Sequence, residues 1–350
     1  MDNDNKVISF LTDRNDFQLE PVQDKIDFNN EYTKIKLTKN QKSQISMAVQ
    51  HIPEIMASES MCDAYILTFP DGINHSLVSL KQGGFMSTYT DGNGNFAGTG
   101  SLYSLKAEAV LLQAFSIMAI VSGQYFITKI HSELKMINQS LDKILEFLYG
   151  DKKSELLSEV TFIKYAYENY SSIMEHPEQR IATISSIQGA KKIAVKDIEF
   201  YMCDLEARVN EKRNINDIVV ESFNVKESLD LSIQLFGLCC VLEVYYSQNQ
   251  DVEYIQRMQK ETNMYIDKCE KRMLSSFSTL RKYINDYKGR LLEKIDKTEY
   301  EQDVGGVIDL LNNGEESDIR KSVRKTLQAA MTNKEYCVSK DGNVYLKVMS

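Results

Sequence analysis

Residues 109–148 read AVLLQAFSIMAIVSGQYFITKIHSELKMINQSLDKILEFL, and the character of the chain changes halfway along this run. No charged residue occurs from Ala109 to Thr128. From Ile127 onward the apolar residues recur in alternating steps of three and four, the heptad spacing of a helix that packs along one seam against another helix. The residues of this first seam are Ile127, Ile130, Leu134, Ile137, Leu141, Ile144 and Leu148. An apolar helix that continues into such a seam predicts a helical protein that assembles or that contacts a membrane.

A second seam with the same spacing lies in a long helix that we expect from residue 252 to about residue 297. Its residues are Met273, Phe277, Leu280, Ile284, Tyr287 and Leu291. Because the two seams are similar in length, we expect them to pack against each other as an antiparallel pair within one chain. The alternative is that the first seam packs against another copy of the chain.

Helix-breaking residues are rare, since the chain has only 4 prolines and none after Pro177. This scarcity, with abundant Lys, Glu, Ile, Leu and Met, predicts a mainly α fold, an elongated helical bundle with coiled-coil seams. We divide the chain into an irregular N-terminal arm (1–37), a kinked helix with a β-hairpin insert (38–104, the insert at about 62–104), a long-helix bundle (105–300), and a short helix with a terminal hairpin (301–350). Inside the bundle we expect helices at 152–174, at 178–210 with an interruption near Gly189, and at 229–246 after a weaker stretch at 215–225.

Local signals mark where several elements begin or turn. Thr38 and Gln41 have the spacing of a capping box, which predicts a helix over 39–58 with a kink at Pro53. Turn residues at 91–94 separate two β-prone segments, 85–90 and 95–101, and so predict the hairpin of the insert. Asp341 and Gly342 in the same way predict a hairpin at the C-terminus.

The uncharged run at 109–128 has two interpretations. As a helix it would rise about 30 Å, the thickness of a hydrocarbon core. Its candidate lipid-facing residues are Leu111, Leu112, Phe115, Ile117, Met118, Ile120 and Val121. Gln113, Ser122 and Gln124 interrupt it, which favours a helix buried inside a bundle, with conditional insertion into a membrane as the alternative. A second apolar run, 231–242, is too short to span a bilayer, and we expect it to pack inside the protein.

Composition narrows the class of partner. The formal net charge is -9 and the basic residues are dispersed, which argues against nucleic acid as a partner. The acidic N-terminus has no hydrophobic signal segment, so we expect a cytoplasmic protein, with membrane association as the alternative. The 6 cysteines form no C-x-x-C pair and are expected to be buried free thiols. Richness in Lys, Asn and Ile is typical of an AT-rich bacterial source.

Motifs that would indicate chemistry are incomplete. Asp91, Asn93 and Asn95 match the first three calcium ligands of an EF-hand, but Phe96 and Leu102 take the positions of its glycine and its bidentate glutamate. The glycines near them lack the Gly-Lys-Ser/Thr ending of a phosphate loop, and the four histidines share no metal-ligand spacing. The carboxylate pairs are expected on solvated faces, and they are Glu199 with Asp204, Asp267 with Glu270, and Glu315 with Glu316. We therefore expect no enzyme, cofactor, metal site or small-molecule substrate.

The order of the elements, long helices with a hairpin beside an apolar helix, resembles that of α-helical pore-forming toxins, although no motif is shared. The leading hypothesis is a cytoplasmic interaction or scaffold protein that self-associates, or docks a partner protein, through its seams. The alternative, which the resemblance favours, is a membrane effector that exposes the 109–128 helix on a trigger.

Overall fold

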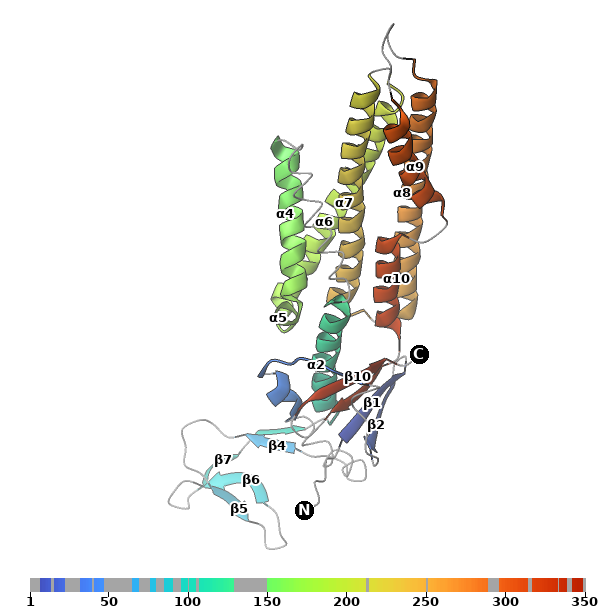
Figure 1. Cartoon of the computed structure of the whole chain (residues 1–350). Helices are drawn as coiled ribbons and strands as arrows, with labels where there is room; N and C mark the ends of the chain where they lie inside the picture. Colours follow the sequence, from blue (N-terminus) through green and yellow to red (C-terminus); the bar gives the residue numbers. More distant parts are fainter. Residues whose placement is uncertain are drawn as a thin grey trace. The chain divides into compact units, whose positions relative to one another are not determined.

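The computed structural model divides into two compact units, residues 1–121 with 334–349, and residues 122–333 (Figure 1). It describes residues 7–13, 16–22, 32–39, 41–46, 65–68, 76–79, 85–90, 96–99, 101–104, 107–128, 150–211, 214–249, 251–288, 296–313, 317–332, 334–338 and 342–348. Over these residues the chain is mainly helical, as the sequence predicted.

The first unit contains a five-stranded sheet in the order β2-β1-β9-β10-β3. Its strands are β1 (Val7–Asp13), β2 (Asp16–Val22), β3 (Thr33–Lys34), β9 (Lys334–Val338) and β10 (Val344–Val348). The strands β1 to β3 lie where the sequence analysis predicted an irregular arm. The analysis missed the antiparallel pair that β1 forms with β2, and it could not anticipate that β1 also pairs with β9, from the other end of the chain, because a non-local partner leaves no local pattern.

The terminal hairpin is confirmed, since β9 and β10 pair antiparallel with Cys337 opposite Tyr345. Gly342, at the predicted turn, has a φ of 72°, and a Cβ there would lie 2.3 Å from the carbonyl oxygen of Lys42. Both the backbone conformation and the close approach therefore require glycine.

The helix that approaches Gly342 begins with the predicted capping box. Thr38 N donates to Gln41 Oε1 at 3.0 Å, and Gln41 N donates to Thr38 Oγ1 at 3.2 Å. Residues 41–46 are helical, whereas the rest of the predicted helix and its kink at Pro53 lie outside the described residues.

The predicted β insert is present. β4 (Tyr65–Thr68) pairs with β8 (Ser101–Ser104), and β5 (Ser76–Ser79), β6 (Phe85–Thr90) and β7 (Phe96–Thr99) form a three-stranded antiparallel sheet. The β6–β7 pair is the hairpin predicted from the turn residues, and the turn itself lies outside the described residues.

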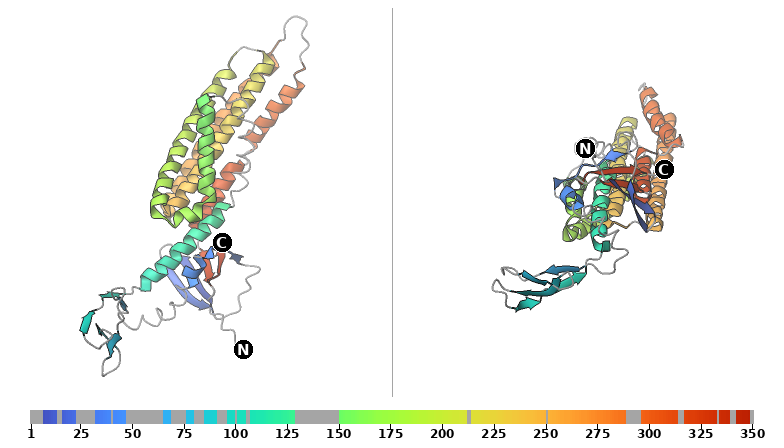
Figure 2. Two further views of the ribbon diagram at one scale, coloured as in Figure 1. Left: turned by 90° about the vertical axis from the view of Figure 1, so that its left-hand side faces the viewer. Right: turned by 90° about the horizontal axis from the view of Figure 1, so that it is seen from below.

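Helix α2 (Ala107–Ile127) begins in the first unit and ends in the second. The second unit is otherwise formed by α4 (Gly150–Glu168), α5 (Tyr170–Met174), α6 (Pro177–Arg208), α7 (Ile215–Ser247), α8 (Val252–Asp286), α9 (Thr298–Asn312) and α10 (Asp318–Met331). The long helices run alongside one another (Figure 2). With 32, 33 and 35 residues, α6, α7 and α8 make this unit an elongated bundle.

Helix boundaries differ from the prediction in several places, and the helix predicted at 152–174 is divided at Asn169 into α4 and α5. α6 continues through Gly189, because the cost of about 1 kcal/mol for a helical glycine is small beside the packing of the whole helix. α7 joins the two segments predicted at 215–225 and 229–246 into one helix, which begins at a cap where Asn214 accepts from Asn216 N. α8 ends at Asp286, short of residue 297.

The core of the bundle forms around α7. Among its buried side chains are all those from 235 to 242, so this part of the helix is covered on every side. α8 is different: it buries a single stripe, and it exposes the opposite face, where the Met264 side chain is 61% exposed. The bundle is therefore an apolar central helix wrapped by amphipathic ones.

Candidate functional site

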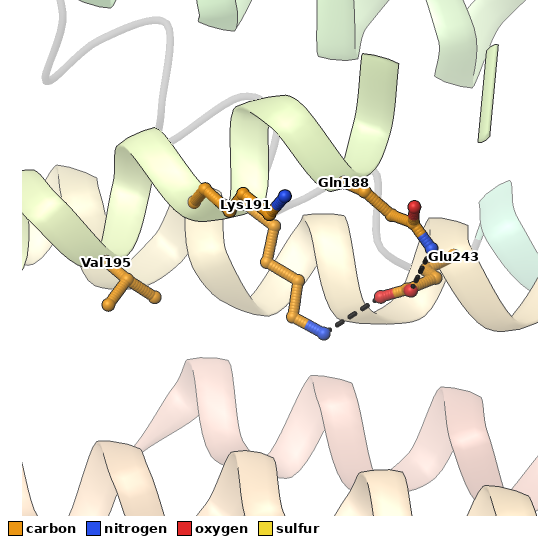
Figure 3. A pocket seen from close by; sticks show the side chains of 5 residues that line it. Gln188, Lys191, Val195 and Glu243 are labelled. Carbon is orange, nitrogen blue, oxygen red and sulfur yellow. Dashed lines mark hydrogen bonds and ion pairs between the residues drawn. The ribbon is translucent and has the colours of Figure 1, made fainter. Parts of the chain in front are cut away.

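A hollow of about 380 Å³ opens on the surface where α6 meets α7 (Figure 3). Gln188, Lys191, Lys192 and Val195 of α6 line it together with Glu243 of α7. Gln188 Nε2 donates to Glu243 Oε1 at 2.9 Å, and Lys191 Nζ donates to Glu243 Oε2 at 2.8 Å. Each carboxylate oxygen thus has a partner in the wall of the hollow, and the interaction joins α6 to α7.

The environment of Lys191 keeps it charged. Burial by itself lowers the pKa of this ammonium group, but the nearby Cys240 and Glu243 raise it, and the net pKa lies above the ordinary value. Burial also raises the pKa values of the Cys239 and Cys240 thiols. The hydrogen bonds that Gln188 and Lys191 donate to Glu243 make the wall of this hollow a polar clamp between α6 and α7.

A second clamp joins α6 to α8. Arg272 binds Glu206 through two hydrogen bonds, Nε to Oε1 at 2.8 Å and Nη2 to Oε2 at 3.1 Å, and binds Glu199 Oε2 through Nη1 at 2.7 Å. Tyr265 donates its hydroxyl to the other oxygen of Glu199 at 3.2 Å. The hydrogen bond from Arg272 is the main cause of the lowered pKa of Glu199.

Further ion pairs join the remaining helices. Arg320 of α10 binds Glu270 of α8 at 3.0 Å and lies 3.7 Å from Asp267. Arg208, near the end of α6, binds Asp204 on its own helix and Glu221 on α7. The carboxylates of both described pairs, predicted on solvated faces, are partly exposed and also bind arginine side chains. Sequence spacing could not identify their arginine partners, because Arg272 and Arg320 lie on other helices.

The carboxylate of Glu159 on α4 lies near two other acidic side chains. Burial, together with Glu155 on the same helix and Asp197 on α6, raises the pKa of Glu159. Lys196 offsets part of this charge, because its Nζ lies 3.5 Å from Glu155 Oε1. The α4–α6 contact is thus less favourable electrostatically than the Arg272 clamp.

The structure places the second seam inside the bundle. Met273, Phe277, Leu280 and Ile284 are at most 3% exposed, and the ring of Phe277 meets that of Phe223 on α7 edge to face, with 5.5 Å between the centroids. Tyr287 is the half-buried cap residue after α8. Leu291 and the first-seam residues at 130–148 lie outside the described residues, whereas Ile127 is fully buried at the end of α2.

The predicted apolar run forms the greater part of α2. Ile117, Met118, Ile120 and Val121 are at most 9% exposed. Leu111, Leu112 and Phe115 belong to the same helix, but their side chains are not among those described.

Sequence reasoning underestimated α7. Within the described residues it is the one helix long and apolar enough to cross a membrane, although 83% of the relevant window is buried inside the protein. The prediction that 231–242 packs inside the protein agrees with this burial, whereas the length of the helix around it was not predicted.

Sequence reasoning also missed a close contact at the last turn of α2. A Cβ on Gly123 would lie 2.6 Å from the hydroxyl oxygen of Tyr170. Gln124 Oε1 accepts from Ser171 N at 3.2 Å and from Ser171 Oγ at 3.3 Å. The available signal was the pair of small residues at 122 and 123, which indicates close helix contact without identifying the partner.

The described part of the chain contains no group of three His, Cys, Asp or Glu side chains that could hold a metal ion. His176 precedes α6 at its N-cap, and the other three histidines lie outside the described residues. Comparison with known proteins gives no assignment, since no family model, curated protein or solved structure matches the chain.

Proposed function

We propose that this chain is a helical interaction protein that self-associates, or docks a partner protein, through the part of the first seam that follows Ile127, a residue that is itself buried within the chain. The observation that carries the proposal is the burial of the second seam. On α8, each of the heptad positions from Met273 to Ile284 lies on a face packed against the rest of the bundle. The same spacing at 127–148 is therefore expected to mark a face that also packs against a helix.

The second seam is a poor candidate for that helix. Phe277 already packs on Phe223, so α7 occupies the face of α8 on which the first seam was expected to lie. If the second seam is not its partner, the first seam needs another apolar helix face to pack against. The first seam of a second copy of the chain is such a face. Self-association is accordingly the form of the proposal that we would test first.

The test is the mass of the purified chain in solution at micromolar concentration, by light scattering after size exclusion. We expect a particle larger than the 40.1 kDa monomer. Leu141→Asp, which places a charge in the middle of the seam, should return the particle to the monomer mass without loss of helical content. Met264→Asp, on the exposed face of α8, is the matched control and should leave the assembly intact. A wild-type chain that is monomeric throughout contradicts self-association.

The apolar stretches of α2 and α7 support a second candidate, a membrane-acting protein that exposes an apolar helix on a trigger. α2 has 21 residues, with Glu108 the only charged one, and α7 has the length and composition of a membrane span. Co-flotation with vesicles of phosphatidylcholine and phosphatidylglycerol tests this candidate. Binding that Ile120→Asp abolishes and Met264→Asp retains supports it, provided that both variants keep the wild-type circular dichroism. Absence of binding under neutral and mildly acidic conditions contradicts it.

A further inference from the structure

Two neighbouring residues in the last turn of α2 contact the start of α5 in different ways. Gln124 presents one side-chain oxygen to Ser171, and that oxygen accepts both the backbone N–H and the hydroxyl of Ser171 at 3.2 and 3.3 Å. Ser171 lies in the first turn of α5, where backbone N–H groups have no partner within the helix. The side chain of Gln124 therefore satisfies a helix end from outside that helix.

Gly123 lets α2 approach Tyr170 closely. A Cβ at this position would lie 2.6 Å from the Tyr170 hydroxyl oxygen, 3.0 Å from Cε1 and 3.1 Å from Cζ, and the first of these distances is too short for a real contact. Tyr170 is also well fixed: its hydroxyl donates to the Tyr245 carbonyl at 3.1 Å, and its ring meets that of Tyr246 edge to face at 5.0 Å. A larger residue at 123 would thus displace α2 more readily than it would displace Tyr170.

The partner surface does not depend on α2 for its own cohesion. Tyr246 donates its hydroxyl to the Ala166 carbonyl at 2.7 Å, which joins α7 to α4 independently of the bond from Tyr170. Tyr245 donates to the Thr326 carbonyl at 2.8 Å and so joins α7 to α10. These bonds would remain in place if the last turn of α2 departed.

We propose that Gly123, Gln124, Tyr170 and Ser171 form a latch that keeps the apolar helix α2 docked on the bundle and that opens without unfolding it. The hydrogen bonds of the latch converge on a single neutral oxygen, and its packing contact is a glycine on a tyrosine. Opening the latch uncovers Phe126 and Ile127, which are 5% and 0% exposed when it is closed. These two residues continue the uncharged run, so an open latch extends the apolar surface that α2 can offer. The proposal that the latch controls lipid contact rests on the second candidate function above. The proposal that the latch opens does not depend on that function.

The test compares alanine at two helical glycines. Gly123→Ala places a methyl group against Tyr170, whereas a Cβ on Gly189 of α6 meets nothing within 4 Å. Gly189→Ala therefore reproduces the gain in helix propensity without the collision. Tyr170→Phe removes the oxygen that collides, and the double variant Gly123→Ala/Tyr170→Phe should recover most of the docking. Tyr170→Phe alone gives the baseline for the double variant.

The readout is amide hydrogen exchange, followed by mass spectrometry, in peptides that cover 117–127 and in peptides from α6 and α7. We expect Gly123→Ala to accelerate exchange in 117–127 by about tenfold, with α6 and α7 unchanged, and the double variant to reverse most of this effect. Exchange in 117–127 that equals that of Gly189→Ala overturns the latch. Acceleration that spreads equally through α6 and α7 also overturns it, because α2 is then an inseparable part of the core.

Flotation of the same variants separates the latch from the membrane function. Accelerated exchange in 117–127 together with increased binding to phosphatidylcholine–phosphatidylglycerol vesicles supports both. Accelerated exchange without any vesicle binding supports the latch and contradicts its role in lipid contact.

Discussion

Replacing Phe277 with alanine tests whether the second seam holds the monomer together or faces a partner. The ring is fully buried on α8 and lies 5.5 Å from that of Phe223, at an interplanar angle of 81°. Truncating a buried phenylalanine costs about 3–5 kcal/mol, and the lost edge-to-face pair places this site near the middle of that range or above it. With a urea dependence of about 3 kcal/mol/M, a loss of about 4 kcal/mol lowers the unfolding midpoint by roughly 1.3 M.

The assay is urea unfolding followed by circular dichroism at two protein concentrations. Met264→Ala is the matched control, since Met264 lies on the exposed face of the same helix and its truncation should change stability by less than about 0.5 kcal/mol. For Phe277→Ala, we expect the midpoint to fall by the same amount relative to the wild type at both protein concentrations, because the contact lies within one chain. A loss below about 1 kcal/mol would refute the assignment of this seam to the core. A difference from the wild type that changes with protein concentration would instead place the seam between copies.

Three further predictions concern charge and thiol chemistry. Because the folded state raises the pKa of Glu159, ionisation of this carboxyl group destabilises the fold above that pKa. Glu159→Gln should therefore increase the free energy of unfolding by about 0.5 kcal/mol at pH 7 and by less at pH 4. Unfolding curves at the two pH values measure both changes. Ionisation of Glu199 has the opposite effect, because the folded state lowers its pKa and the charged form therefore stabilises the fold. This stability is present above the unfolded pKa of about 4.3 and is lost as the pH falls through the folded pKa. Arg272→Met should thus cost about 1 kcal/mol at pH 7, a deficit that shrinks below about pH 4, and a deficit independent of pH would contradict the electrostatic origin. In the native protein at pH 8, maleimide should label the exposed Cys203 and leave the buried Cys240 unmodified until urea is added, as peptide mapping would show.

The heptad pattern predicted a packing face correctly where the structure describes it. Met273, Phe277, Leu280 and Ile284 recur with helical periodicity, so the side chains on one face of α8 could be identified without knowing what covers them. The pattern could not identify α7 as the cover, because heptad spacing describes one helix and carries no information about its partner. The end of α8 was equally hard to predict, since no proline or cap residue marks Asp286.

The polar contacts that join the helices are the part of the structure that sequence reasoning missed. Arg272 and Glu206 are 66 positions apart, and Tyr170 and Tyr245 are 75 positions apart. Such pairs form only when the helices already lie side by side, and nothing local distinguishes Arg272 from an arginine on a solvated face. The same holds for the pairing of β1 with β9, which begins more than three hundred residues later, although not for its pairing with the neighbouring strand β2.

The distribution of these contacts decides which apolar helix could leave the bundle. α7 satisfies the length and hydropathy of a membrane span, but its Glu243 is bound to Lys191, and its tyrosine hydroxyls bond to carbonyl groups at Ala166 and Thr326. Removing α7 would break these bonds together and would expose the core that every other long helix covers, a cost comparable to global unfolding. At the last turn of α2, the contacts with α5 include the hydrogen bonds to one neutral oxygen of Gln124 and the close approach of Gly123 to Tyr170, and neither involves a charged group. If the protein acts on a membrane, the helix that reaches the lipid is therefore α2, even though α7 is the one that hydropathy selects.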